Sequence, residues 1–252
     1  MMRLIKNTLP QKYSSSILPL LFFFCLIFLS VSCRTKKNEP DGSIIGYDYY
    51  PIQTGLFYIY EVTERKYNGI LNGQESYSDT LYYVKELIFT PITINDETKY
   101  QVYRFYKTAT APTFDDQPDS VWTVFNDRSK IIKAENNYRY IKLIFPPENG
   151  RTWDGNALNF FGIDIYTAAQ YRKPFSYTVN NETKNYPSTV TVIQEDEKNL
   201  VNKDYRIEVY AQGVGMVYKQ SEYYEYEQPI TPANRINVGK RTIYKLISHG
   251  IE

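Results

Sequence analysis

Apolar and polar side chains alternate along much of this chain. Between Tyr205 and Ala211 every second residue is apolar, and much the same alternation runs from Tyr138 to Phe145. A two-residue period places successive side chains on opposite faces of a β-strand. One apolar face and one wetter face are typical of an antiparallel sheet with a core on one side. The pattern therefore predicts antiparallel sheet.

Segments rich in aromatic and β-branched residues follow one another as strands do. They cover residues 57–63, 80–90, 99–107, 120–126, 130–134, 138–145, 175–180, 188–194, 205–211, 215–222 and 242–248. Turn-prone pairs suit hairpins and occur at Asn68-Gly69, Asn72-Gly73, Asn126-Asp127 and Asn180-Asn181. We expect a mainly β fold: a single antiparallel domain of about ten strands, built either as a curved sheet that forms a partial barrel or as a sandwich.

One segment has a different period. From Ala157 to Ala169 the apolar residues fall at helical spacing, so the pattern predicts one short helix near residues 157–169, packed on the sheet. Gly162 lies inside this segment and weakens a helix.

The N-terminal part of the chain differs from the rest in charge and hydropathy. Arg3, Lys6 and Lys12 precede the apolar run Ile17–Leu29, which is the arrangement of a secretory signal. The run has thirteen residues, whereas a helix needs roughly 20 apolar residues to cross a membrane. Small residues then lead into Cys33, after which the chain turns polar.

The junction before Cys33 resembles the lipobox of bacterial lipoproteins, although Ser30 stands where lipoboxes favour leucine. The resemblance implies cleavage before Cys33 and transfer of a diacylglyceryl group to its thiol, which would attach the protein to a membrane. We therefore expect a signal peptide over residues 1–32, the lipidated cysteine with a flexible tether over 33–48, and a β-rich domain over 49–252.

Composition excludes several classes of function. Cys25 would leave with the signal, so the mature domain has no free thiol for catalysis or metal binding. The mature chain carries 26 basic and 28 acidic residues, and a near-neutral domain is not suited to nucleic acid. The chain has one histidine, His249, and no catalytic or phosphate-binding motif. We expect no enzymatic activity, no cofactor and no metal site.

Aromatic side chains supply the candidate ligand contacts. The 26 tyrosines fit half-buried strands, or alternatively an aromatic ligand-binding face. Trp153 lies between turn-prone glycines and is followed by Asp154 and Asn156. This segment is either a structural corner with the indole in the core, or a stacking platform for a sugar whose hydroxyls bond Asp154 and Asn156. Trp122 is a second candidate for ligand stacking.

Three blocks of sequence carry a family resemblance: Tyr49–Tyr60, then Lys142–Pro146 with Gly150–Asn156, and Glu208–Lys219. In this order they resemble an uncharacterised envelope lipoprotein family of the Bacteroidota. The resemblance covers most of the mature chain and implies an envelope lipoprotein. The family has no assigned activity, so the resemblance transfers no functional residue.

Two short features fit such an origin. Thr80 and Ser120 each lie between an aspartate and an aliphatic residue, which resembles the sequon for O-glycosylation of exported proteins in these bacteria. Cys33 is followed by Arg34 rather than by aspartate, which by analogy with lipoprotein sorting favours the outer membrane. The basic residues after the cysteine do not resemble an acidic surface-export tag, which favours the periplasmic face.

Three functions remain open. The first is a non-enzymatic, lipid-anchored envelope protein that binds a partner or has a structural role. The second is a carrier of a lipid or other apolar ligand, with a tyrosine-lined cavity. The third is a glycan-binding surface lipoprotein that uses Trp153 and Trp122. The expected partners are the membrane, through the diacylglyceryl group on Cys33, and a glycan, a lipid or another envelope protein.

Overall fold

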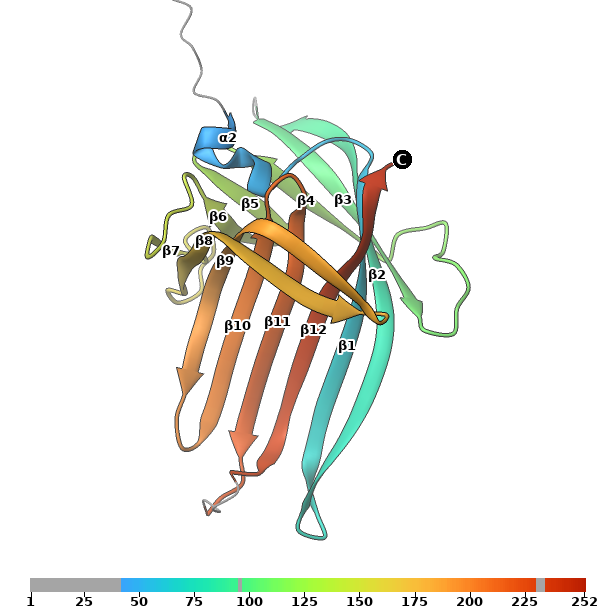
Figure 1. The fold of residues 1–252 in the computed structure, drawn as a ribbon, viewed down its shortest axis with the longest axis vertical. Coiled ribbons are helices and arrows are strands. Elements are labelled where there is room, and N and C mark those ends of the chain that lie inside the picture. Colours follow the sequence, from blue (N-terminus) through green and yellow to red (C-terminus); the bar gives the residue numbers. More distant parts are fainter. Residues whose placement is uncertain (1–41, 95–96, 230–233) are drawn as a thin grey trace, which may run out of the picture. The chain divides into compact units, whose positions relative to one another are not determined.

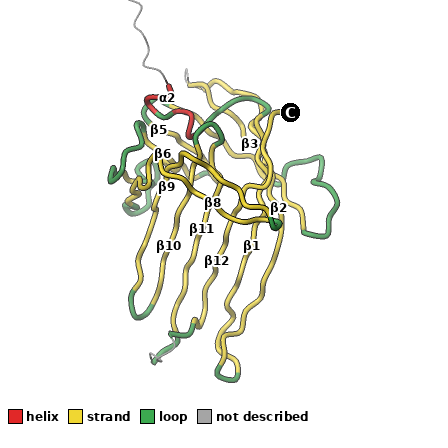
Figure 2. The backbone as a smooth tube through the Cα atoms, in the orientation of Figure 1, coloured by secondary structure: helices red, strands yellow, loops and turns green. Residues whose placement is uncertain are grey.

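The computed structural model describes residues 42–94, 97–229 and 234–252. The predicted signal peptide, Cys33 and the first part of the predicted tether lie outside these residues. The described part begins with a short helix, α2 (Gly42–Ile45), and a 3-10 turn, η1 (Tyr47–Tyr49). All other regular structure in the described part is β-strand, as Figure 2 shows.

In the described part of the chain, twelve strands form a single antiparallel sheet. They are β1 (Leu56–Leu71), β2 (Gln74–Ile94), β3 (Glu97–Thr108), β4 (Ser120–Asn126), β5 (Lys130–Glu135), β6 (Tyr138–Ile144), β7 (Thr152–Asp154), β8 (Ile165–Val179), β9 (Glu182–Lys198), β10 (Asn202–Ala211), β11 (Gly215–Tyr226) and β12 (Ile236–Ile251). The order across the sheet is β6-β5-β4-β3-β2-β1-β12-β11-β10-β9-β8-β7. The sheet curls strongly (Figure 1). The predicted mainly β fold is confirmed, as a partial barrel.

Tight turns join several neighbouring strands where the sequence predicts them. Asn72 and Gly73 join β1 to β2, and Asn180 and Asn181 join β8 to β9; all four residues have positive φ. Consecutive residues with positive φ match the twist of hairpin strands. Asn68-Gly69 is not a turn, contrary to the prediction, because β1 continues through it and its pairing with β2 shifts there.

The helix predicted near residues 157–169 is absent, and this prediction is wrong. Residues 157–163 form turns and irregular backbone, and β8 begins at Ile165. The Asp154 carboxylate accepts hydrogen bonds from the amides of Asn156 and Asp164, at 2.9 and 3.0 Å, so the segment closes as a loop. Tyr166 and Ala168 then alternate into the core as strand residues do.

The two edge strands, β6 and β7, meet where the sheet curls back on itself. The Ile141 amide donates to the Gly155 carbonyl at 3.0 Å, and Trp153 Nε1 donates to the Ile141 carbonyl at 2.8 Å. The Asn159 side chain bonds both the amide and the carbonyl of Arg139, at 2.9 Å each. These bonds satisfy backbone groups that an open sheet edge would leave unpaired. The barrel is therefore nearly closed.

Buried side chains form two clusters, and each joins strands that are distant in the sequence. One contains Val84 of β2 and Val209 of β10. The other contains Val124 of β4 and Val190 of β9. Residues on opposite walls of the curl thus pack together, which holds the sheet in its curved form.

The hairpin of β8 and β9 crosses strands β10 to β12 (Figure 1). Gln170 and Arg172 have positive φ, and the pairing of β8 with β9 shifts at this point, so the hairpin bends. Tyr177 Oη donates to the Leu246 carbonyl at 2.7 Å and so ties the outer half of the hairpin to β12. This half of the hairpin packs against the first core cluster.

The segment with α2 and η1 packs against the barrel. Tyr47 Oη donates to the Arg128 carbonyl in the β4–β5 turn at 2.7 Å. The Gly213 amide, in the β10–β11 turn, donates to the Asp48 carbonyl at 2.8 Å. Tyr49 is buried, and its hydroxyl hydrogen-bonds with Ser188 Oγ at 2.6 Å. The residues that lead into β1 thus lie across the turns at one end of the barrel.

Candidate ligand-binding cavity

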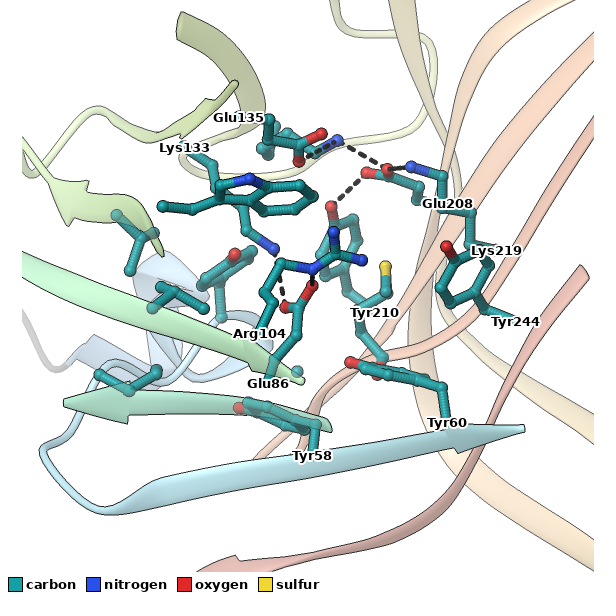
Figure 3. Close-up of a pocket in the computed structure, with 18 of the residues that line it drawn as sticks. Tyr58, Tyr60, Glu86, Arg104, Lys133, Glu135, Glu208, Tyr210, Lys219 and Tyr244 are labelled. Carbon is teal, nitrogen blue, oxygen red and sulfur yellow. Dashed lines mark hydrogen bonds and ion pairs between the residues drawn. The ribbon is translucent and has the colours of Figure 1, made fainter. Parts of the chain in front are cut away.

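A cavity of about 280 Å³ lies inside the curl of the sheet. Its wall comes from strands β1 to β6 on one side and β10 to β12 on the other. Tyrosines and charged side chains dominate it (Figure 3). The volume is near the lower end of the range of small-molecule sites, about 300–1,000 Å³.

Five tyrosines line the cavity, and their hydroxyls are used differently. Tyr60 Oη donates to the Met216 carbonyl at 3.1 Å, and Tyr210 Oη donates to Glu208 at 2.5 Å. Tyr50 and Tyr58 also line the cavity, and among the described residues no hydrogen bond is formed by either hydroxyl. Tyr50 and Tyr58 therefore present phenol groups that can bond a ligand.

A glycine makes room for one of these phenols. Gly215 has a φ of +104°, and a Cβ at this position would lie 2.8 Å from Tyr58 Oη. The start of β11 thus needs glycine, both for the backbone conformation and for the Tyr58 ring that faces it.

One group of charges on the wall centres on Glu86 of β2. Arg104 Nε donates to Glu86 Oε1 at 2.9 Å, and Lys133 Nζ donates to Oε2 at 2.8 Å. The side chains of Arg104 and Lys133 are only 6% and 7% exposed. Figure 3 shows both cations directed at the same carboxylate. One carboxylate therefore serves two buried cations.

A second group of charges joins β5, β6, β10 and β11. Lys142 Nζ lies 2.6 Å from Glu208 Oε1 and 3.5 Å from Glu135 Oε1. Lys219 Nζ lies 3.1 Å from the same oxygen of Glu208. The Tyr210 hydroxyl donates a hydrogen bond to the other oxygen of the Glu208 carboxylate. Two carboxylates and two lysines alternate here, so this group is balanced in charge.

The charges keep the carboxyl groups of the cavity ionised. Burial alone would raise the pKa of Glu86, but the nearby charges of Lys133 and Arg104 outweigh burial and lower this pKa to about 2. Burial likewise opposes ionisation of Glu208 and Glu135, yet Lys142 and Lys219 hold the pKa of each carboxyl below its ordinary value. None of the three is poised to donate a proton at neutral pH.

Trp122, predicted to stack on a ligand, lies in the cavity wall. The Arg104 guanidinium is 3.7 Å from its ring centroid, and Lys133 Nζ is 4.9 Å away. Its Nε1 donates to Asn136 Oδ1 at 3.3 Å. The indole therefore supports the two cations that hold Glu86, and its contact with a ligand stays a prediction.

Trp153, Asp154 and Asn156 lie together but outside the cavity. Trp153 is half-buried against the second core cluster, and its Nε1 is bonded to the β6 backbone. Asp154 holds the following loop, and Asn156 Nδ2 donates to the Gly162 carbonyl at 3.3 Å. All three side chains thus have structural bonds at the closure of the barrel. A sugar contact by this segment stays a prediction.

The predicted modification sites lie elsewhere. Thr80 is exposed on β2, and Ser120 is half-buried at the start of β4. His249 is exposed on β12, opposite Tyr58, and is not among the residues that line the cavity. Cys33 lies outside the described residues.

The charged residues of the cavity were not identified from the sequence. Lys142 and Glu208 lie on the strand faces that alternation assigns to the wetter side. A signal was nevertheless present, because the three blocks that carry the family resemblance include Tyr58, Lys142, Glu208 and Lys219, which all line the cavity.

No protein-family model and no curated protein matches the chain. Among solved structures it is similar to a Bacteroides fragilis protein described as exported and as having a YmcC-like fold, with 11% identity, coverage of 80% of this chain and 98% of that chain, and a TM-score of 0.31. It is also similar to a Parabacteroides distasonis protein described as a lipoprotein, with 13% identity, the same coverage and a TM-score of 0.30. At these scores the likeness transfers neither fold nor function.

Two further observations bear on the site and its surroundings. Across the described ranges, no group of three or more His, Cys, Asp or Glu side chains is placed to hold a metal ion. In the same residues no helix is long and apolar enough to cross a membrane.

Proposed function

We propose that this chain is a lipid-anchored envelope protein that binds a small molecule in the cavity of its β domain, without catalysing a reaction. The observation that carries the proposal is the cavity itself, in which seven charged side chains and five tyrosines line an internal space. Of the three functions that the sequence leaves open, binding in a cavity has the most structural support.

The energetics of the wall support a binding role. Charged groups are expensive to remove from water, and apolar residues of similar volume would fill the same space at lower cost. Glu86, Arg104, Lys133, Lys142 and Glu208 are nevertheless buried there. A requirement to recognise a polar ligand accounts for their presence.

The same lining argues against an acyl chain as the ligand. An apolar chain would cover the hydroxyls of Tyr50 and Tyr58 without bonding them, and leaving buried polar groups unpaired is unfavourable. The apolar carrier is therefore less well supported than a carrier for a polar ligand. The bonded position of Trp153 likewise gives the glycan-binding function no specific support.

Protonation supports binding over catalysis. The carboxyl groups of the cavity have lowered pKa values and are already paired with cations. His249 lies outside the cavity and on the surface. The carboxyl groups of the wall are therefore ionised at neutral pH, and none of them is available as a general acid.

The anchor is tested by labelling cells with an alkyne fatty acid. We expect label on the wild-type chain and none on Cys33→Ser, with the labelled protein in the outer-membrane fraction. Protease added to intact cells should leave the domain uncut if it faces the periplasm. An unlabelled wild-type chain would refute the anchor.

The cavity is tested by native mass spectrometry of the full chain purified from the cell envelope in detergent. We expect a bound small molecule on the wild type and none on Val124→Phe, because the larger ring enters the cavity that Val124 lines. Val201→Phe is the matched control, since Val201 is exposed and outside the cavity wall. Equal occupancy in the three proteins would contradict the proposal.

A further inference from the structure

The charges of the cavity wall do not balance. Among the described residues, the wall has four cations, Arg104, Lys133, Lys142 and Lys219, and three carboxylates, Glu86, Glu135 and Glu208. The group around Glu208 alternates in sign and is neutral. The excess therefore lies in the group around Glu86, where two cations share one carboxylate.

This excess charge is poorly solvated. Arg104 and Lys133 are almost entirely buried, whereas Lys219, in the balanced group, has a side chain that is 30% exposed. A buried charge without a counter-charge is unfavourable in a protein interior. An anion from outside the chain would restore the balance at this point of the wall.

Arg104 also has hydrogen-bonding capacity to spare. Its Nε bonds Glu86 and its Nη1 bonds the Tyr106 hydroxyl, while among the described residues no group accepts a bond from Nη2. A guanidinium has five N–H donors in a planar fork that fits a carboxylate. Figure 3 shows Arg104 among the labelled residues of the cavity.

We propose that the cavity binds a small aromatic carboxylate, with the carboxylate at Arg104 and Lys133 and the ring among the tyrosines. The inference rests on the proposed function of the cavity and names its ligand class. One excess positive charge matches a monoanion, whereas a phosphate ester carries about −1.5 to −2 at pH 7. The walls of Tyr50, Tyr58 and Tyr60 provide aromatic surface for a flat ring.

The test compares two isosteric probes by isothermal titration calorimetry on the full chain in detergent. 4-Hydroxyphenylacetate carries the carboxylate, and 4-hydroxyphenylacetamide replaces it with a neutral amide of the same shape. We expect the carboxylate to bind about tenfold or more tightly, because bonds to a charged group are stronger than neutral ones.

Three variants assign the preference to the proposed residues. Arg104→Gln removes the excess charge but leaves Glu86 paired with Lys133, so the preference for the carboxylate should fall below about threefold. Lys133→Gln removes the second cation and leaves Glu86 paired with Arg104, so the preference for the carboxylate should fall in the same way. Arg65→Gln, an ion-paired arginine on β1 outside the cavity, is the matched control and should keep the preference.

The outcomes separate the two proposals. A preference that disappears in Arg104→Gln or Lys133→Gln and survives in Arg65→Gln supports the ligand class. Equal affinity of the wild type for both probes, or affinity for neither, overturns it. In those cases a small molecule that copurifies with the wild type and is lost in Val124→Phe still supports binding in the cavity. If Arg104→Gln fails to fold, the comparison of probes on the wild type and on Lys133→Gln decides.

Discussion

Glu208 has only 1% of its surface exposed, the lowest fraction of any charged residue in the described ranges. Its carboxylate is surrounded by Lys142, Lys219 and the Tyr210 hydroxyl. Removing a member of such a group leaves the buried charges that remain with fewer partners, which is unfavourable. At the residue scale, the stability of the barrel interior therefore depends on complete pairing.

Glu208→Gln should lower the free energy of unfolding by about 3 kcal/mol or more, because Lys142 then loses its nearest carboxylate inside the protein. Urea unfolding followed by fluorescence measures the change. Glu64→Gln is the control, since the pair of Glu64 with Lys240 is partly exposed and such pairs contribute about 0–1 kcal/mol. Equal urea midpoints for the two variants would contradict the importance of the buried group.

The pH dependence of stability follows from Glu86. Its pKa is about 2 in the folded protein, below the ordinary glutamate value of 4.5 that we take for the unfolded chain. A lowered pKa in the folded state stabilises the protein fully above about pH 4.5, and this contribution is lost as the pH falls toward 2. The contribution is roughly 3 kcal/mol.

We therefore expect the free energy of unfolding of the wild type to fall between pH 5 and pH 2 by more than that of Glu86→Gln. Urea titrations at a series of pH values compare the two slopes, which removes any difference in stability at neutral pH. Parallel curves would show that Glu86 has the same pKa in the folded and unfolded chains.

At the scale of elements, the barrel is closed by an irregular segment rather than by strand pairing. The Gly155 carbonyl accepts the Ile141 amide of β6, and Asn159 bonds the backbone of Arg139. The Tyr166 ring of β8 packs directly on Gly155. The loop between β7 and β8 thus replaces a strand at this edge.

Gly155→Ala should destabilise the protein by about 1–3 kcal/mol, the usual cost of overpacking. An added Cβ would lie 2.3 to 2.7 Å from atoms of the Tyr166 ring. Amide hydrogen exchange at Ile141 should become faster, because the Gly155 carbonyl that accepts the hydrogen bond of this amide is displaced. Gly162→Ala is the matched control: its Cβ meets no atom within 4 Å, and its stability should be unchanged. Equal stability of the two variants would refute the packing of Tyr166 on Gly155.

At the scale of the whole domain, the pairing of β1 with β12 joins the two halves of the sheet. β12 lies between β1 and β11 and pairs with both. Every other pair of neighbouring strands is consecutive in the chain, and β6 and β7 lie at the two edges of the sheet. Within the described residues, this long-range pairing therefore joins two meanders, β1 to β6 and β7 to β12, into one sheet.

A chain ending after Arg235 lacks β12 and should show no cooperative unfolding transition, because β1 and β11 both lose a partner strand and the cavity loses part of its wall. Circular dichroism during thermal unfolding measures this. Replacing residues 113–117, in the mostly exposed β3–β4 loop, with a short Gly-Ser linker is the control and should change stability by less than about 1 kcal/mol. A cooperative transition in the shortened chain would contradict the role of β12.

Local chemistry made much of the fold predictable. The alternation from Tyr205 to Ala211 predicts β10. The pairs Asn72-Gly73 and Asn180-Asn181 predict turns, and these residues have positive φ in the structure. The segment 157–169 was misjudged because aromatic and alanine residues matched a helical period, while bonds from Asp154 and pairing with β9 made it a loop and a strand.

The cavity could not be predicted in the same way. Glu86, Arg104, Lys133, Lys142 and Glu208 lie on five different strands. The alternating pattern shows which residues share a face, but not that a face is buried when the sheet curls around it. In β10 the residues from Ile207 to Ala211 are all buried. The face of β10 that the pattern assigns to the wetter side therefore faces the cavity and contributes Glu208 to it.

The β class, most of the strands and the turns at Asn72-Gly73 and Asn180-Asn181 could be predicted from the sequence, because they follow from the period of the side chains and the backbone preferences of single residues. Only the tertiary structure decided that the sheet closes on itself, that Trp153 supports the closure, and that seven charged residues face one cavity. The physical reason is that these depend on contacts between residues far apart in the chain, such as Lys142 with Glu208, which no local pattern records.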